Sequence, residues 1–358
     1  MSSSQVATVL VVDDSAFMRR LITQMVDASP DFRVVGTARN GLDAIRQIQE
    51  LNPQIVTLDV EMPELDGMQT LGYIMSETPR PVVMLTAATS DNGASLALRC
   101  LELGAVDFVR KPSGPISLDL ESVGETLLTA LRAATQVNLR SVRALARPTF
   151  VEARPRPSVG GGADWCVAIA SSTGGPRALA EVIPHLPRNL GAAVCVVQHM
   201  PAGFTRSLAM RLDSMSHLRV SEASEGEVVE ANRVYVAPGG RHMRVAGAPN
   251  GVRRIQLDDG PTVWGVRPAA DLLFTSVAGA FGKQSVGVVL TGMGRDGSDG
   301  LQSIRAAGGL AVVQDRETST IYGMPQAALA RAGADRVAAL EDVAPSVVHL
   351  LSGRRGLS

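Results

Sequence analysis

The sequence predicts an α/β protein with two doubly wound parallel-sheet domains, and two observations support this fold class. Short apolar runs alternate with longer segments whose apolar residues recur at helical spacing, a pattern typical of parallel sheets covered on both faces. The length of 358 residues also suits two domains of about 150 residues each. We expect a first domain over residues 5–128, a linker over 129–162 and a second domain over 163–352.

Five strand-like runs define the first domain. They are Thr8–Val12, Val34–Thr37, Ile55–Leu58, Pro81–Leu85 and Val106–Val109. The segments between them, such as Ser15–Ala28 and Gly41–Leu51, are each one helix long, which is what crossovers between parallel strands require. The loops that follow these strands are therefore expected to gather at one edge of a sheet.

The linker and the second domain follow from changes in composition. Residues 133–162 carry five arginines against a lone Glu152, together with prolines and three consecutive glycines, which indicates a solvated tether. The strand-like runs of the second domain are Cys166–Ala170, Val194–Val197, Arg233–Ala237, Ser285–Thr291 and Leu310–Gln314. Between the third and fourth runs lies a less regular region, His242 to Pro268, in which the Asp-Gly step of Asp258-Asp259-Gly260-Pro261 suggests a turn in a hairpin excursion.

Composition excludes several classes of protein. A net charge of −1 and an aromatic content of 3% argue against bulk nucleic-acid binding, because neither a basic field nor stacking rings are plentiful. No apolar run approaches the ~18 residues of a membrane span. Cys100, Cys166 and Cys195 lack metal-site spacing and are expected to be buried and reduced. We expect a cytoplasmic protein with no membrane insertion.

Acidic residues follow two of the first domain's predicted strands. Asp13 and Asp14 follow the first strand and Asp59 follows the third, so adjacent strands would bring three carboxylates together. Their repulsion calls for a divalent cation, and oxygen ligands with room for water suit Mg²⁺. Thr86 is placed to hydrogen-bond a phosphoryl oxygen, and Lys111 to supply a positive charge for it. The cluster predicts a phosphoryl-acceptor site with Asp59 as the acceptor.

Three polar signatures each follow an apolar run in the second domain. They are Ser171-Ser172-Thr173-Gly174-Gly175, Gln198-His199-Met200 and Thr291-Gly292-Met293-Gly294-Arg295-Asp296-Gly297. At one sheet edge Ser172, His199 and Asp296 would form a nucleophile, its base and the group that orients the base. The backbone N–H of Thr173, at a helix N-terminus, is suited to a developing oxyanion. The pattern predicts a serine hydrolase.

Other residues compete for these roles. His242 follows a strand-like run less closely than His199, so it is kept as a substrate contact or a structural residue. Asp271 and Asp299 remain alternatives to Asp296. A phosphate-cradling loop would need a lysine after the glycines, and none follows Gly174-Gly175.

Residues from about Thr8 to Leu128 resemble the receiver domain of two-component response regulators. Beyond the acidic cluster, the resemblance takes in Met62-Pro63, Asp66-Gly67 and the segment 107–112. It implies a flavodoxin-like fold and allows a cis bond between Lys111 and Pro112. The implied roles are phosphorylation of Asp59, Mg²⁺ binding by Asp13, Asp14, Asp59 and the backbone carbonyl of Glu61, and switching by Thr86, Phe108 and Lys111.

Residues from Trp165 to Leu351 resemble the catalytic domain of the chemotaxis protein-glutamate methylesterase (CheB) family. Besides the three signatures, the resemblance takes in Pro201-x-Gly203-Phe204-Thr205, Tyr235-x-Ala237-Pro238-Gly239 and Tyr322-Gly323-Met324-Pro325. It implies a Rossmann-like hydrolase domain with the following roles: Ser172 as nucleophile, His199 as base, Asp296 as orienter, and Thr173 and Met293 as oxyanion-hole donors. The family usually has glycine at the position of Ala170, and alanine would be strained there if positive φ were required.

Together the two resemblances imply a phosphorylation-activated esterase. Its expected substrates are glutamate methyl esters, and also glutamines, on methyl-accepting chemotaxis proteins, cleaved through an acyl-enzyme on Ser172. A chemotaxis histidine kinase is the expected phosphodonor, and Mg²⁺ serves receiver phosphorylation only, with no cofactor for ester hydrolysis. We expect a monomer in which the unphosphorylated receiver covers the Ser172 edge.

Two other functional classes are weaker. A binding module without turnover would not need Ser172, His199 and Asp296 together. A DNA-binding regulator would need a basic helix-turn-helix output, and the glycine-rich second half shows none.

Overall fold

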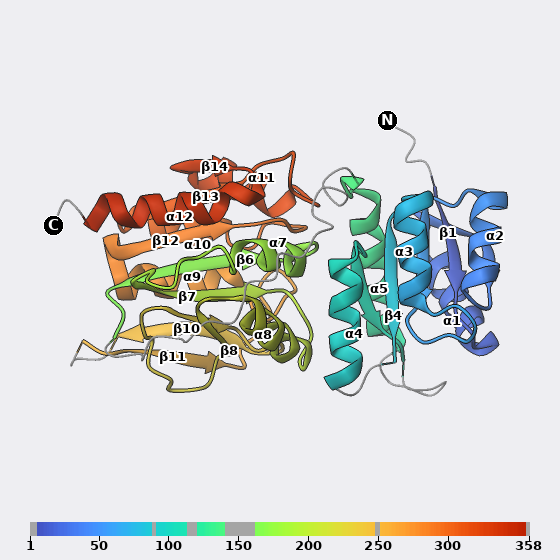
Figure 1. The fold of residues 1–358 in the computed structure, drawn as a ribbon, viewed down its shortest axis with the longest axis horizontal. Helices are drawn as coiled ribbons and strands as arrows, with labels where there is room; N and C mark the ends of the chain where they lie inside the picture. Colours follow the sequence, from blue (N-terminus) through green and yellow to red (C-terminus); the bar gives the residue numbers. More distant parts are fainter. Residues whose placement is uncertain (1–5, 88–90, 113–119, 140–161, 248–250, 356–358) are drawn as a thin grey trace. The chain divides into compact units, whose positions relative to one another are not determined.

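The computed structural model describes residues 6–87, 91–112, 120–139, 162–247 and 251–355. The chain divides into two compact units, each built around a parallel sheet (Figure 1). Most of the predicted linker lies outside the described residues. The predicted fold class is confirmed for both units.

The first unit is a five-stranded parallel sheet in the order β2-β1-β3-β4-β5. Its elements are β1 (Ala7–Val12), α1 (Ala16–Asp27), β2 (Phe32–Ala38), α2 (Gly41–Leu51), β3 (Ile55–Asp59), α3 (Gly67–Glu77), β4 (Val82–Thr86), α4 (Asp91–Glu102), β5 (Asp107–Arg110) and α5 (Leu120–Thr135). This is the flavodoxin-like strand order, in which the chain reverses direction across the sheet between β1 and β3.

Helices α1 and α5 cover one face of the first sheet. Val9 and Val11 of β1 belong to the same buried cluster as Ile22 of α1 and Leu131 of α5. Helix α5 continues to Thr135, past the predicted domain end at residue 128, because its last turns still bury apolar side chains in this cluster.

The second unit is a seven-stranded parallel sheet in the order β14-β13-β12-β6-β7-β9-β8, with a separate two-stranded sheet. Its elements are β6 (Trp165–Ser171), α7 (Gly175–Val182), β7 (Ala192–Gln198), α8 (Phe204–Met215), β8 (Arg219–Glu222), β9 (Arg233–Val236), β10 (His242–Gly247), β11 (Arg253–Asp258), α9 (Ala270–Phe281), the 3₁₀ helix η1 (Gly282–Gln284), β12 (Ser285–Val289), α10 (Ser298–Ala306), β13 (Leu310–Gln314), α11 (Gly323–Ala332), β14 (Arg336–Ala338) and α12 (Leu340–Arg355).

Strand β6 is the switch point of the second sheet. After β6 the chain builds β7, β8 and β9 on one side, and later β12, β13 and β14 on the other. Ligands of open α/β sheets bind at such points, beyond the carboxyl ends of the strands. The edge strands β8 and β14 escaped prediction because they span four and three residues, each with a charged residue at its start.

The predicted hairpin excursion is present as the antiparallel pair β10 and β11. The turn predicted at the Asp-Gly step does not join the two strands, because Asp258 is the last residue of β11 and pairs with His242 at the open end of the hairpin. The Asp-Gly step instead makes a local turn after the strand, in which Gly260 N donates to Asp258 Oδ1 at 2.6 Å.

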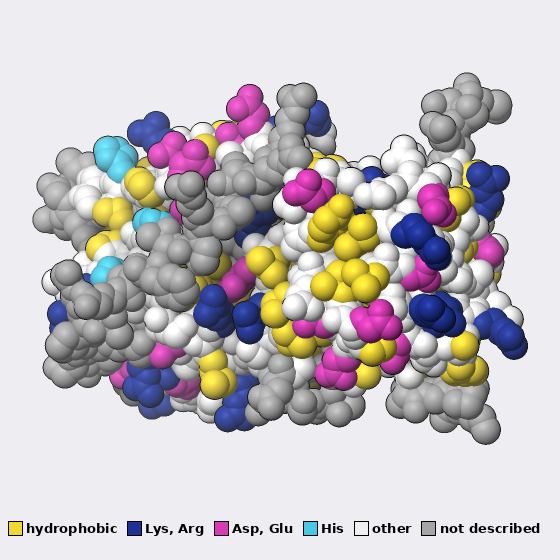
Figure 2. Space-filling model, turned by 45° about the vertical axis from the view of Figure 1, so that its right-hand side comes forward, with side chains coloured by type: hydrophobic (Ala, Val, Ile, Leu, Met, Phe, Trp, Pro, Cys, Tyr) yellow, Lys and Arg dark blue, Asp and Glu magenta, His cyan; other side chains and the backbone are white. Residues whose placement is uncertain are grey.

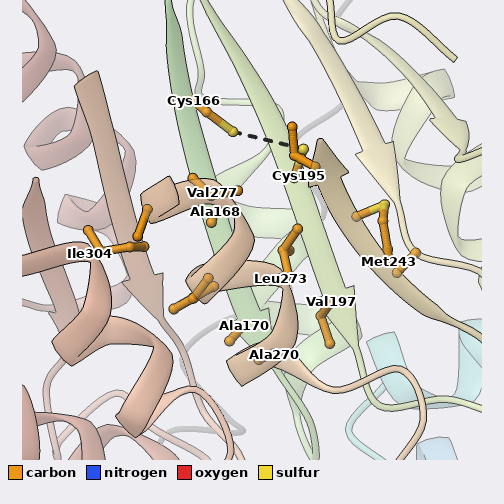
Figure 3. Packing of buried hydrophobic residues seen from close by; sticks show 14 of the residues in the cluster. Cys166, Ala168, Ala170, Cys195, Val197, Met243, Ala270, Leu273, Val277 and Ile304 are labelled. Carbon is orange, nitrogen blue, oxygen red and sulfur yellow. Dashed lines mark hydrogen bonds between the residues drawn. The ribbon is translucent and has the colours of Figure 1, made fainter. Parts of the chain in front are cut away.

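Small side chains on β6 and β7 let helix α9 approach the second sheet closely. Ala168 and Ala170 of β6 lie in one buried cluster with Ala270 and Leu273 of α9 (Figure 3). Cys166 and Cys195 belong to the same cluster, and their sulfur atoms are 3.9 Å apart. The described cysteines are all buried and free, as expected. This packing places the first turn of α9 near the ends of β6 and β12.

The surface carries both signs of charge. Figure 2 shows Lys and Arg side chains interspersed with Asp and Glu side chains over the visible face. No helix within the described residues is long and apolar enough to cross a bilayer.

Ala170 fits its position without backbone strain. It lies inside β6 and is not among the described non-glycine residues with positive φ. Its methyl group packs against the backbone of Gly297, where an added Cβ would lie 3.4 Å away. Close packing, and not an unusual φ, therefore distinguishes this position.

The variant Ala170→Gly is expected to lower the free energy of unfolding of the second unit by about 1 to 2 kcal/mol, because it removes a buried methyl group and frees the unfolded chain. Urea denaturation measures the loss, and hydrolysis of a small ester should stay within about twofold of wild type. A variant that is both more stable and more active would mean that alanine is strained here after all.

Candidate functional site

The three polar signatures of the second unit meet at one edge of its sheet. Strands β12, β6 and β7 are neighbours, and the loops after them carry Asp296, Ser172 and His199 respectively. Backbone hydrogen bonds join these loops, since Ser172 N donates to Thr291 O at 3.0 Å and His199 N donates to Ser171 O at 3.1 Å.

A short hydrogen bond links the imidazole to the buried carboxylate. His199 Nε2 lies 2.8 Å from Asp296 Oδ2, and Asp296 is 2% exposed. The same carboxylate accepts hydrogen bonds from the backbone N–H groups of Ala270, at 2.6 Å, and Asp271, at 2.9 Å. Both groups belong to the first turn of α9, whose N–H groups lack helical partners and whose dipole favours a negative charge.

These contacts decide the ionisation of Asp296. Burial raises the pKa of Asp296, but the hydrogen bonds from His199 and from the N–H groups of Ala270 and Asp271 outweigh it and hold the pKa below its usual value. An ionised carboxylate favours the tautomer with the proton on Nε2. That tautomer leaves the lone pair of His199 Nδ1 available as a base.

The competing aspartates are engaged elsewhere. Asp271 accepts hydrogen bonds from Gly300 N at 2.7 Å and from Trp264 Nε1 at 2.8 Å. Asp299 lies at the surface, where it pairs with Arg331 at 2.7 Å. Neither carboxylate contacts the imidazole of His199 among the described interactions.

His242 stabilises a loop. Its side chain is buried, with Nε2 3.0 Å from Pro261 O and Nδ1 accepting from Ala269 N at 3.1 Å. Both ring nitrogens are therefore used by the backbone that leads into α9.

The candidate oxyanion donors flank Ser172. A Cβ added to Gly292 would lie 2.8 Å from Ser172 Cβ and 2.3 Å from Met324 Sδ, so only glycine lets this loop come so close. Within the described part of the chain, neither Thr173 N–H nor Met293 N–H donates a hydrogen bond. No described hydrogen bond joins Ser172 Oγ to His199 either, and in free enzymes such contacts often tighten only with substrate.

In the first unit, the acidic residues gather at the ends of β1 and β3. Lys111 Nζ lies 2.6 Å from both Asp13 Oδ2 and Asp59 Oδ2. Asp13 and Asp59 are buried and Asp14 is exposed, and one ligand oxygen from each lies within 4.8 Å of the others. Burial lowers the pKa of Lys111, but its contacts with the two carboxylates outweigh this and hold it above its usual value.

The donor set of this cluster fits Mg²⁺. Burial raises the pKa of Asp59 to about 6, and the charge of Asp13 adds to this effect while Lys111 opposes it. A buried carboxylate with so high a pKa lacks enough positive charge around it. Hard oxygen ligands of this kind bind Mg²⁺ through a few carboxylates while it keeps some of its water.

The other receiver residues surround this cluster. Thr86 and Phe108 are buried, and Lys111 N donates to Thr86 O at 2.8 Å. Glu61 follows Asp59 in the chain, and its N–H donates to Asp59 Oδ1 at 3.4 Å. The one cis bond among the described residues is Arg267–Pro268, so Lys111–Pro112 is not cis, contrary to what the resemblance allowed.

Comparison with known proteins decides the family. A family model of CheB methylesterase matches residues 167–347, and one of the response regulator receiver domain matches residues 9–120. A Pyrococcus abyssi protein named protein-glutamate methylesterase/protein-glutamine glutaminase is 44% identical over 353 residues, which cover 97% of this chain and 94% of that protein. The chain belongs to the CheB methylesterase family.

Further relatives agree with this family. A Thermotoga maritima protein with the same description is 41% identical, with 98% of this chain and all of that protein covered. The crystal structure of the Thermotoga maritima CheB methylesterase catalytic domain matches 53% of this chain and 100% of that domain, with a TM-score of 0.51 and 42% identity. The second unit is thus an esterase domain, and the first is a receiver domain.

Sequence reasoning missed Gln198 as a positioning residue. Its buried amide accepts from Ser171 Oγ at 2.8 Å and donates to the carbonyls of Ser172 and His199, both at 3.0 Å. It therefore fixes the loop after β6 against the loop after β7. A polar residue at the end of the otherwise apolar run in β7 was the available signal.

The raised pKa of Asp59 predicts a pH-dependent stability of the receiver without Mg²⁺. The folded pKa of about 6 exceeds the ordinary 3.8, so the folded state binds more protons between these values and stability falls as pH rises through that window. The variant Asp59→Asn should lack this fall and exceed wild type by about 1 to 3 kcal/mol at pH 7.5, with little difference near pH 4.

Denaturant unfolding of the full chain, followed through the receiver transition, measures this profile. Asp14→Asn is the matched control, because Asp14 is exposed and should change stability by less than about 0.5 kcal/mol. Parallel pH profiles for wild type and Asp59→Asn would show that another group titrates.

Proposed function

We propose that this chain is a phosphorylation-activated esterase that hydrolyses glutamate methyl esters, and deamidates glutamines, on methyl-accepting chemotaxis proteins. The observation that carries this proposal is the His199–Asp296 pair, 2.8 Å apart, held beside Ser172 at the switch point of a CheB-family sheet. The family relatives carry both activities in their names.

In the proposed first half-reaction, Ser172 Oγ attacks the ester carbonyl and His199 takes the hydroxyl proton at Nδ1. Negative charge develops on the carbonyl oxygen, where the N–H groups of Thr173 and Met293 would receive it. His199 then gives its proton to the departing methoxy oxygen. Methanol leaves, or ammonia when the substrate is a glutamine, and an acyl-enzyme remains on Ser172.

In the second half-reaction, a water molecule takes the place of the departed methanol or ammonia. His199 accepts a proton from water as its oxygen attacks the acyl carbon, and returns this proton to Ser172 Oγ when the tetrahedral intermediate collapses. The product is a glutamate side chain. Asp296 stays ionised throughout, because its partners hold its pKa low, and stabilises the imidazolium that forms twice in each cycle.

We propose that the receiver controls this chemistry. Asp59 would accept a phosphoryl group from a chemotaxis histidine kinase, with Mg²⁺ held by Asp13, Asp14, Asp59 and the Glu61 carbonyl to supply positive charge for the transfer. Lys111 and Thr86 would then engage the phosphoryl oxygens. We propose that the unphosphorylated receiver covers the Ser172 edge and that this new state uncovers it.

This function requires a cytoplasmic protein, since the kinase and the methylated receptor segments lie on that side of the membrane. We propose a monomer, because each chain would carry both its receiver and its complete esterase site.

Ser172→Ala is expected to abolish hydrolysis of a methylated receptor while the fold is retained, because loss of a triad nucleophile typically costs on the order of 10⁶ in rate. Ser171→Ala is the matched control. Its hydroxyl bonds Gln198, so this variant should lose some stability but keep most of its activity. An inactive Ser171→Ala beside an active Ser172→Ala would move the nucleophile to the other serine.

Mg²⁺ with acetyl phosphate is expected to raise receptor demethylation by the full chain, and Asp59→Asn should remove this response. A fragment beginning near residue 160 should be more active than the unphosphorylated full chain and indifferent to acetyl phosphate. If that fragment, shown to be folded, is slower than the resting full chain, the receiver does not act as a cover.

A further inference from the structure

Trp264 occupies an unusual turn next to the esterase site. Val263 and Val266 form two backbone hydrogen bonds with each other, at 3.1 and 3.0 Å, which closes a two-residue turn over Trp264 and Gly265. The φ angles of these two residues are 55° and 78°. Positive φ at both central positions defines a type I′ turn.

Tryptophan is a poor choice for such a turn. Type I′ turns favour Asn-Gly, because asparagine tolerates the left-handed conformation and bulky side chains resist it. Trp264 is nevertheless 51% exposed, so burial of the indole does not explain its presence. Strained positions of this kind gather at functional sites.

Two contacts hold the exposed indole in a fixed orientation. Trp264 Nε1 donates to Asp271 Oδ2 at 2.8 Å, and the guanidinium of Arg295 lies over the indole, 4.4 Å from the ring centroid. The side chains of Trp264 and Arg295 form one exposed surface, here named the Trp-Arg shelf.

The shelf is attached to the elements that hold Asp296. Arg295 directly precedes Asp296 in the loop after β12, and the N–H of Asp271 donates to Asp296 Oδ1 at 2.9 Å. The segment that carries Trp264 is itself fixed, since Arg267 Nη1 donates to the carbonyls of Asp259 and Gly260, both at 2.8 Å. The shelf is therefore a preformed surface beside the esterase site.

The charge of the shelf indicates its ligand. The carboxylate nearest to Arg295 is that of Asp299, 3.6 Å away, and Asp299 is shared with Arg331 at 2.7 Å. Arg295 is half-exposed and contacts Asp299 only at this longer distance, so its guanidinium keeps N–H groups at the surface that can donate to a carboxylate of a ligand, while the carboxylate of Asp271 is used by Trp264 and Gly300. A helix that carries glutamates would suit this surface, because the indole would pack on their aliphatic stems and Arg295 would pair with a carboxylate one turn from the reacting side chain.

We propose that the Trp-Arg shelf binds the glutamate-bearing helix of the receptor and so determines affinity for protein substrates. This inference rests on the proposed function. Trp264 and Arg295 act as specificity residues for the receptor and take no part in the bond-making steps at Ser172.

Trp264→Asn tests the shelf, because asparagine suits the type I′ turn and the fold should be unchanged. For a methylated chemotaxis receptor KM should rise about tenfold, the usual effect of losing an aromatic anchor. The kcat on the receptor and the hydrolysis of p-nitrophenyl acetate should change by less than about twofold. Arg295→Gln should raise KM similarly and weaken its dependence on salt.

Met210→Asn is the matched control, since Met210 is 67% exposed on α8, and it should leave KM unchanged. An unchanged receptor KM in Trp264→Asn, with wild type active, would overturn the shelf and leave the proposed function standing. A fall of about tenfold in p-nitrophenyl acetate hydrolysis by Trp264→Asn would also contradict the proposed role of the shelf, because it would show that Trp264 only supports Asp296. If wild type hydrolyses p-nitrophenyl acetate but not the methylated receptor, the proposed function fails, and the shelf with it.

Discussion

The buried carboxylate of Asp296 is the constraint on which the esterase unit depends. A charge so far from water needs several hydrogen-bond donors, and here they come from His199, from the first turn of α9 and from Gly297 N, at 3.0 Å. Helix α9 must therefore lie tightly on the sheet. The small side chains of β6 and the glycine at 297 make that approach possible.

The two units shift the pKa of a buried aspartate in opposite directions. Asp296 has enough donors that its pKa falls despite burial, so its charge is permanent. Asp59 has fewer hydrogen-bond donors around its carboxylate, and burial raises its pKa to about 6. A buried carboxylate with few partners for its charge is stabilised when it binds a cation or a reacting group. A carboxylate whose charge already has enough partners can instead orient its neighbour. The same residue type is thus suited to reaction in one unit and to support in the other.

The sequence predicted the fold class and the placement of the candidate residues because both depend on short-range patterns. Apolar runs located most of the strands, and polar residues directly after them located Ser172, His199 and Asp59. Contacts between distant segments could not be read in this way. The donation from α9 to Asp296, the hydrogen bonds of Gln198 and the position of the hairpin turn depend on how helices and strands pack, and no local pattern encodes them.

Along the chain, the hairpin of β10 and β11 and the segment that follows it come between strand β7, which precedes His199, and strand β12, which precedes Asp296. They are nevertheless not part of the seven-stranded sheet. Substitutions there can alter the surface beside the esterase site without moving the strands that align the reacting groups. If the Trp-Arg shelf binds the receptor as we propose, recognition and chemistry depend on separate segments of this chain. Related proteins could diverge in the targets they bind through this segment alone while the hydrolytic apparatus stays constant.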